Sequence, residues 1–232
     1  MDIDKNRVRA VVFDLDGTLY DNRKFPFWLI FSNLRDMFAF NAERKVRRMM
    51  KGVDLDNADT FYNFFFLHLS EKSRFATAED AKKWYWEDYM ERFPDILSEH
   101  CKANPGVEKI FKRFADLEIE TAIYSDYPMV KERVEALGLP EDLCENYWAA
   151  PDMGAFKPAI RPMHEIASEL GVDADELLVV GDRVDTDGKS AFSCGAQFIH
   201  ILKKKGKSEK ADNYVSMHWD EFVDFVKNWN QH

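Results

Sequence analysis

Two pairs of carboxylates stand directly after apolar runs of the sequence. Asp14 and Asp16 lie one residue apart in VVFDLDGTLYDN, and Asp182 and Asp187 lie in GDRVDTDGKS, which follows ELLVV. Carboxylates gathered in one place repel one another unless a cation joins them. Hard oxygen donors with few nitrogen or sulfur ligands favour Mg²⁺. We therefore interpret these aspartates as a magnesium site that would also take a phosphate.

Donors for a phosphate group occur in the same setting. Thr18 follows the first pair, Ser125 and Asp126 end the run IETAIYSD, and Lys157 begins KPAIRPMHEIASEL. Ammonium, hydroxyl and exposed backbone N–H groups all bind phosphate. One carboxylate could then attack phosphorus as a nucleophile. A second, two residues away, could give a proton to the leaving oxygen and later take one from water.

These residues need a scaffold that brings distant segments to one edge. Short runs rich in β-branched residues predict strands at 8–13, 119–125, 176–182 and 196–202, with another near YWAAPD. Amphipathic patterns predict helices at 107–117, 128–137, 159–170 and 186–194, and a C-terminal helix in WDEFVDFVKNW. This alternation predicts an α/β fold with a doubly wound, Rossmann-like, mostly parallel sheet. Such sheets bind ligands outside the carboxyl ends of their strands.

The segment 21–104 is different, because it carries no strand pattern and is rich in aromatic residues. We expect an all-helical cap domain with its own small core, inserted into an α/β core made of residues 1–20 and 105–232. TAED at 77–80 has the spacing of a helix N-terminus, with Thr77 as its cap. Because the insert leaves from the edge where the first strand ends, we expect it to lie over the site as a lid.

The motifs DLDGT, YSD, KP and GDRVDTD, in this order and each at a strand end, resemble the four motifs of the haloacid dehalogenase (HAD) superfamily, specifically its phosphatases. The resemblance covers about residues 8–21 and 105–202, and the insert is similar to a C1 cap. It implies that Asp14 is the nucleophile of a phosphoaspartyl intermediate. It implies that Asp16 is the general acid and base and that Thr18 orients that acid.

The resemblance also implies roles at the other strand ends. Ser125 would hydrogen-bond the phosphoryl group, and Lys157 would neutralise charge on the nucleophile and phosphate. Asp182 would bind Mg²⁺ directly, and Asp187 would bind it directly or through water. Asp14 and the backbone carbonyl of Asp16 would complete the ligand set.

Asp126 departs from the family pattern, in which Asn is common at this position. A carboxylate close to a phosphate dianion is unfavourable unless it points away or is neutralised. If the backbone N–H of Asp126 makes the substrate contact, little is lost.

The expected function is a Mg²⁺-dependent phosphatase that acts on a small phosphorylated metabolite through an aspartyl-phosphate. A phosphotransferase or mutase, or a phosphonatase, on the same core stays open. A binding module that has lost turnover stays open as well. A 2-haloacid dehalogenase would need neither Asp16 nor a metal, so the presence of Asp16 and Asp182 argues against it.

Composition narrows the cellular setting. The 232-residue chain has a formal net charge of −10, which argues against nucleic acid as a partner. The basic run KKKGK at 203–207 is interpreted as a solvated loop, with a phosphate-facing role as the alternative. Three distant cysteines signal neither a zinc site nor a disulfide framework. Without a signal-peptide or membrane-spanning pattern, we expect a cytoplasmic monomer or homodimer with no membrane partner.

Overall fold

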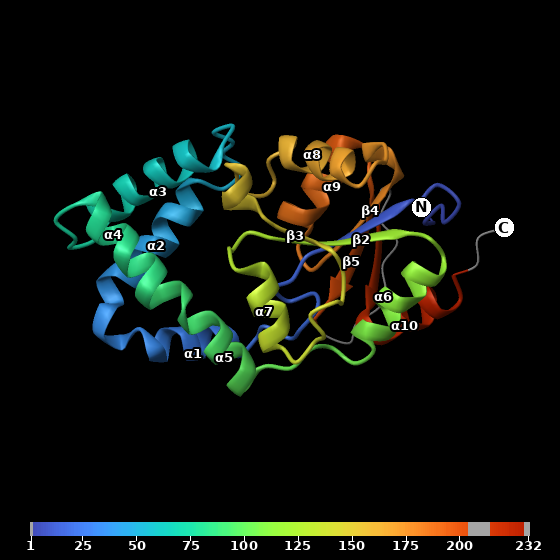
Figure 1. Cartoon of the computed structure of the whole chain (residues 1–232), viewed down its shortest axis with the longest axis horizontal. Helices are drawn as coiled ribbons and strands as arrows, with labels where there is room; N and C mark the ends of the chain where they lie inside the picture. Colours follow the sequence, from blue (N-terminus) through green and yellow to red (C-terminus); the bar gives the residue numbers. More distant parts are fainter. Residues whose placement is uncertain (1, 204–213, 230–232) are drawn as a thin grey trace.

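A six-stranded sheet, parallel at every pairing, lies at the centre of the α/β half of the molecule (Figure 1). The computed structural model describes residues 2–203 and 214–229. Its strand order is β3-β2-β1-β4-β5-β6. The strands are β1 (Ala10–Phe13), β2 (Glu120–Ser125), β3 (Asn146–Ala149), β4 (Leu177–Gly181), β5 (Gln197–Leu202) and β6 (Val215–His218). The predicted doubly wound sheet is confirmed, and β6 is an edge strand that sequence patterns did not predict.

Helices cover both faces of this sheet, which explains why its strands are apolar throughout. Along β1, Val11 and Phe13 join the buried cluster on one face, and Ala10 and Val12 join the cluster on the other. The first face is covered by α6 (Val107–Asp116), α7 (Val130–Ala136) and α10 (Trp219–Lys227). The second is covered by α8 (Arg161–Glu169) and α9 (Lys189–Cys194). Side chains alternate along a strand, so a strand between two helical layers must be apolar at every position.

The segment between β1 and α6, which we call the helical segment, contains helices and no named strand within its described residues. Its main helices are α1 (Phe25–Ser32), α2 (Met37–Met49), α3 (Ala58–Lys72), α4 (Ala78–Trp84) and α5 (Arg92–His100). In Figure 1 they lie together beside the carboxyl edge of the sheet. The predicted N-terminus at Thr77 is confirmed, because Thr77 and Asp80 form a reciprocal capping box at the start of α4. Among residues 2–203 and 214–229, no helix combines the length and apolar character that crossing a bilayer requires.

The helical segment does not have the separate core that we expected. Its buried residues form one continuous apolar cluster with the residues under α6, α7 and α10. Phe61 of α3 packs edge-on against Phe156, with ring centroids 4.8 Å apart, and Phe93 of α5 lies 5.0 Å from Tyr127. Large aromatic rings reach across the boundary, so the two parts share buried surface. That residues 21–104 act as a cap domain over a core of 1–20 and 105–232 stays a prediction.

A short strand-like contact joins the helical segment to the loop that leads to Lys157. The backbone N–H of Leu55 donates to the carbonyl of Gly154 at 2.9 Å, and that of Phe156 donates to the carbonyl of Val53 at 3.0 Å. Arg161 forms an ion pair with Asp54, 2.7 Å between its Nη2 and Oδ1. These contacts hold the segment against the sheet edge at which the site residues lie.

Candidate active site

The central strands end at one edge of the sheet and deliver the first site residues there. In the pairing register, Phe13 of β1 lies beside Ile123 of β2 and Val180 of β4. Asp14 directly follows β1, and Asp182 directly follows β4. Their convergence therefore follows from parallel pairing alone.

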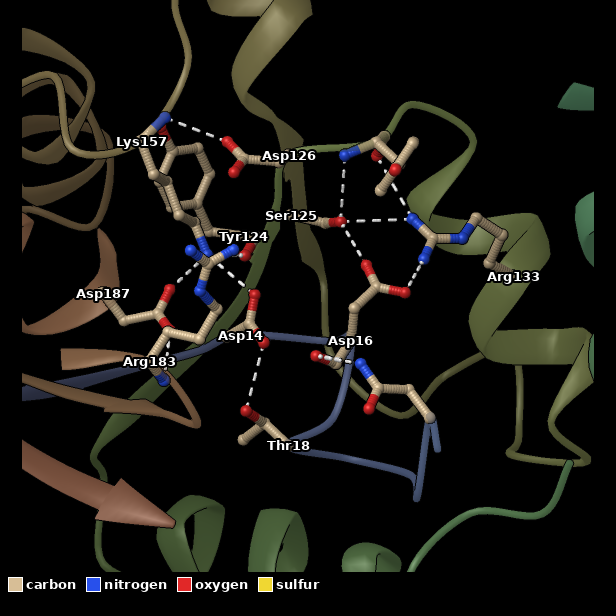
Figure 2. A network of polar contacts seen from close by, with 12 residues as sticks. Asp14, Asp16, Thr18, Tyr124, Ser125, Asp126, Arg133, Lys157, Arg183 and Asp187 are labelled. Atoms are coloured by element: carbon tan, nitrogen blue, oxygen red, sulfur yellow. Dashed lines mark hydrogen bonds and ion pairs between the residues drawn. The ribbon is translucent and has the colours of Figure 1, made fainter. Parts of the chain in front are cut away.

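Lys157 links two of the predicted site carboxylates (Figure 2). Its Nζ donates to Oδ1 of Asp14 at 2.8 Å, to Oδ1 of Asp187 at 2.9 Å and to the carbonyl of Tyr124 at 2.8 Å. Burial alone would lower the pKa of Lys157, but Asp14 and Asp187 outweigh it and hold that pKa well above its usual value. Lys157 is thus a permanent buried cation between two carboxylates.

Thr18 contacts Asp14, whereas we expected it to orient Asp16. Its hydroxyl donates to Oδ2 of Asp14 at 3.1 Å. The backbone N–H groups of Thr18 and Leu19 both donate to the carbonyl of Leu15, so the chain curls back over the end of β1. This turn brings a side chain four positions on over Asp14, a contact that the motif spacing alone did not define.

Asp16 belongs to a second network on the far side of Asp14. In Figure 2 its carboxylate points toward Ser125 and Arg133, whereas that of Asp14 points toward Lys157. Oδ1 of Asp16 accepts from Arg133 and, at 2.7 Å, from the hydroxyl of Tyr20, and Oδ2 accepts from the Ser125 hydroxyl at 2.9 Å. Burial alone would raise the pKa of Asp16, but Arg133 and these hydrogen bonds outweigh it and lower that pKa.

The Asp126 carboxylate is turned toward backbone. Its Oδ1 accepts from the N–H of Lys157 at 2.9 Å, and its own carbonyl accepts from Nη1 of Arg47 in α2 at 2.9 Å. Burial raises the pKa of Asp126, with Lys157 opposing the shift. Both polar groups of this residue therefore tie the site to its surroundings: the carboxylate to the loop of Lys157, and the carbonyl to the helical segment.

Three carboxylates are close enough to hold one cation. Asp14, Asp182 and Asp187 each place an oxygen so that all three lie within 4.8 Å of one another. Burial raises the pKa of Asp14 to about 7, partly offset by Lys157, and burial with the charge of Asp14 raises that of Asp182 to about 6. Lys203 also forms an ion pair with Asp182. The ammonium groups of Lys157 and Lys203 do not balance the charge of three carboxylates. The oxygen donors of the cluster therefore fit a hard divalent cation.

The fourth predicted metal ligand is engaged elsewhere in this structure. The backbone carbonyl of Asp16 accepts a hydrogen bond of 3.0 Å from Nδ2 of Asn22. Of the basic run at 203–207, Lys203 faces the site, where its Nζ also donates to Oδ1 of Asn22 at 3.0 Å. Residues 204–207 lie outside the described residues.

Two glycines allow the carboxylates to approach the backbone. Gly17 has φ of +95°, and a Cβ there would clash with Oδ2 of Asp182. A Cβ on Gly181 would lie 2.5 Å from the side chain of Asp187. Neither position has room for a side chain, so the glycines of DLDGT and VVGD are required by the packing of the cluster.

A cavity of about 260 Å³ opens onto these groups, and Asp14, Asp16, Lys157, Asp182 and Asp187 all line it. A larger cavity of about 520 Å³ lies between the residues that follow α5 and those that end α7. None of the clustered carboxylates lines that larger cavity. Chemistry and not size therefore identifies the site.

Sequence reasoning missed several residues that contact the site. Tyr20 and Asn22 follow the first motif closely, and their proximity to it was an unused signal. Arg133 and Arg47 lie on helices, where charged residues are usually exposed, so nothing local marked them. Asp185 lies between Asp182 and Asp187 in the sequence, but it pairs with Lys51 and Arg183 near the surface.

Comparison with known proteins places the chain in a family. The family model of haloacid dehalogenase-like hydrolases matches residues 8–195. A glyceraldehyde 3-phosphate phosphatase of Methanocaldococcus jannaschii is 28% identical over 226 residues, covering 95% of this chain and 98% of that protein. A phosphoglycolate phosphatase of Rhodospirillum rubrum is 27% identical over 200 residues, covering 82% of this chain and 78% of that protein.

Solved structures share the fold. A HAD phosphatase from Thermococcus onnurineus superposes with a TM-score of 0.60 at 19% identity, covering 97% of this chain and all of that one (100%). A 2-haloacid dehalogenase from Pseudomonas syringae superposes with a TM-score of 0.62 at 19% identity, covering 96% and 100%. Because the same fold carries both chemistries, the reaction must be argued from the side chains of the site.

Proposed function

Because the chain belongs to the haloacid dehalogenase-like hydrolase family, we propose that it is a phosphatase that hydrolyses a small phosphorylated metabolite through an aspartyl-phosphate. The setting of Asp14 carries the proposal. One oxygen of this buried carboxylate accepts from Lys157 and the other from Thr18, while Asp182 and Asp187 lie within cation-binding distance. A carboxylate held so firmly beside a cation site suits nucleophilic attack on phosphorus.

Asp14, Asp182 and Asp187 would hold Mg²⁺, and the carbonyl of Asp16 would join them if Asn22 released it. When bound, the ion would supply positive charge to the phosphoryl oxygens. Lys157 would neutralise charge on the nucleophile and the phosphate, because its ammonium group already contacts both Asp14 and Asp187.

In the first half of the reaction, a carboxylate oxygen of Asp14 forms a bond to phosphorus while the bond between phosphorus and the leaving oxygen breaks. The negative charge of the bound phosphate favours a proton on Asp16. Asp16 gives this proton to the leaving oxygen, so an alcohol departs. In the second half, Asp16 takes a proton from water and the water oxygen attacks phosphorus. The bond to Asp14 then breaks, inorganic phosphate leaves, and both aspartates return to their starting states.

A small substrate fits the dimensions of the site. The cavity of about 260 Å³ is slightly smaller than the usual range for ligand pockets, roughly 300–1,000 Å³. Two of the relatives are named as phosphatases of glyceraldehyde 3-phosphate and of phosphoglycolate, which are small compounds. We therefore propose substrates of this size, and expect neither nucleic acid nor a membrane as a partner.

The deciding experiment measures phosphate release from a panel of small phosphometabolites and from p-nitrophenyl phosphate, with Mg²⁺ and with EDTA. Wild-type protein is compared with Asp14→Asn, in which the amide is a poor nucleophile. Asp175→Asn is the matched control, because Asp175 pairs with Arg7 at the surface, away from the site. We expect Mg²⁺-dependent turnover in wild type and in the control, and none in Asp14→Asn.

Trapping the intermediate would separate this mechanism from direct attack by water. Acid quenching during turnover of ³²P-labelled substrate should leave label on the wild-type chain and not on Asp14→Asn. Full activity in Asp14→Asn would refute the nucleophile, and label on another residue would move that role elsewhere.

A further inference from the structure

We propose that Arg133 is a positioning residue that, with Tyr20, holds one oxygen of Asp16 and leaves the other to transfer the proton. The inference rests on the proposed phosphatase function and concerns residues outside the four sequence motifs. Its starting observation is a buried guanidinium directly against a carboxylate that lines the site cavity.

Arg133 has no room to act as a substrate contact. Its side chain is 0% exposed, on the inward face of α7. One guanidinium nitrogen, Nη2, donates to Asp16, while Nη1 donates to the Ser125 hydroxyl at 3.1 Å and to the Tyr127 carbonyl at 3.3 Å. The guanidinium group of Arg133 therefore contacts both the first and the second motif. It can influence the reaction only through the residues that it holds.

The surroundings of Arg133 keep it in place. The rings of Phe93 and Tyr127 lie 5.4 and 5.7 Å from the guanidinium carbon. If Asp16 moved away, Nη2 of the buried Arg133 would have no acceptor, which is unfavourable in a protein interior. Asp16 is therefore held on the Arg133 side, and a swing of the whole carboxylate toward substrate is disfavoured.

The hydrogen bonds differ between the two oxygens of Asp16. Oδ1 accepts from both Arg133 and the Tyr20 hydroxyl. Among the described residues, Oδ2 accepts only from the Ser125 hydroxyl. That hydroxyl itself accepts from the backbone N–H of Tyr127 and from Nη1 of Arg133. Because the donors surround Oδ1, a proton on Asp16 belongs on Oδ2. The Asp16 side chain is 20% exposed, at the cavity.

This arrangement predicts a specific kind of defect. If Asp16 is no longer held in position, hydrolysis should slow mostly for substrates whose leaving oxygen needs a proton. It should slow much less for substrates whose leaving group departs readily as an anion. Phenyl phosphate and p-nitrophenyl phosphate differ little in size, but p-nitrophenolate is the far better leaving group. Values of kcat/KM report steps up to departure of the phenol, so slower hydrolysis of the intermediate does not obscure the comparison.

The test measures kcat/KM with both aryl phosphates for Tyr20→Phe, Arg133→Lys and Arg133→Met. Tyr20→Phe keeps the buried ring and removes only the hydroxyl on Oδ1. We expect it to lower kcat/KM for phenyl phosphate by about tenfold and that for p-nitrophenyl phosphate by less than about twofold. Arg133→Met should show a larger difference in the same direction, and Arg133→Lys, which retains the charge, should recover part of it.

Tyr85→Phe is the matched control, because Tyr85 is equally buried and its hydroxyl contacts Arg47 at 3.4 Å. Equal losses with both substrates, or no loss in Tyr20→Phe and Arg133→Lys, would overturn the positioning role. If Arg133→Met does not fold by circular dichroism, Tyr20→Phe decides. Loss of the proposed function has a different signature, namely no metal-dependent turnover in wild type or full turnover in Asp14→Asn, and it would withdraw this inference as well.

Discussion

The ammonium nitrogen of Lys157 lies 2.8 Å from Oδ1 of Asp14, and both side chains are almost completely buried. The same nitrogen contacts Asp187, so this one cation offsets two of the three clustered carboxylates. The stability of the protein and the charge of its site are therefore coupled through Lys157.

Replacing Lys157 should destabilise the metal-free protein strongly. Lys157→Met keeps much of the side-chain volume but leaves Asp14 and Asp187 without a cation. Breaking a buried ion pair costs about 3–5 kcal/mol. We expect a loss of that order in the free energy of unfolding in EDTA, and a smaller loss in saturating Mg²⁺. Urea denaturation with and without metal measures both, and Lys131→Met, at an exposed pair with Glu141, is the control.

Stability without metal should fall as the pH rises. The folded-state pKa values of Asp14 and Asp182, about 7 and about 6, exceed the ordinary value of 3.8. The folded protein therefore holds these protons more tightly than the unfolded chain. The contribution is fully present below about pH 4 and is lost as the pH rises through 6 and 7.

Melting temperatures in EDTA between pH 5 and 8 measure this effect, and millimolar Mg²⁺ should flatten the dependence because the ion replaces the protons. Asp182→Asn in EDTA should show a shallower fall than wild type, since one of the two titrating groups is absent. A wild-type melting temperature that is independent of metal across this range would contradict the cation site.

Asp182 should set the metal requirement. Asp182→Ala removes one of the three clustered carboxylate oxygens. Loss of a residue that only hydrogen-bonds to a metal ligand already lowers metal affinity by about 10–100-fold. We expect the dissociation constant for Mg²⁺ to rise by at least about tenfold, measured by calorimetry or by Mg²⁺ titration of the melting temperature. Asp185→Ala, nearby but paired at the surface with Lys51 and Arg183, should leave it unchanged. The opposite ranking of the two variants would reassign the ligand.

Glu43 and Arg47 should behave as a unit in α2. Glu43 is fully buried and its Oε1 lies 2.8 Å from Nε of Arg47, which also donates to the carbonyl of Asp126. Arg47→Met would leave a buried carboxylate alone, at a cost of about 3–5 kcal/mol. The double variant Arg47→Met with Glu43→Gln should be more stable than Arg47→Met alone, because it leaves no buried carboxylate without a cation. Urea midpoints that fall additively in the double variant would show that the pair is not coupled.

Local patterns were sufficient for the central strands of the sheet and for the edge at which the site residues lie. Strands buried on both faces must be apolar along their whole length, so β1, β2, β4 and β5 were legible as short runs, with ends displaced by a residue or two. Since parallel strands end at one edge, Asp14 and Asp182 could be predicted to meet. The short edge strand β6 carries no comparable signal and was missed.

Contacts between distant residues were decided only by the tertiary structure. Thr18 turned out to support Asp14, and Ser125 to face Asp16, because the direction of a side chain depends on the turn that carries it. Arg133 lies 117 residues from Asp16 in the chain, on a helix whose pattern marks it as one charge among several. Local sequence thus determines which residues end the strands, whereas packing determines which charges are buried together, because a counter-ion is chosen by proximity in space.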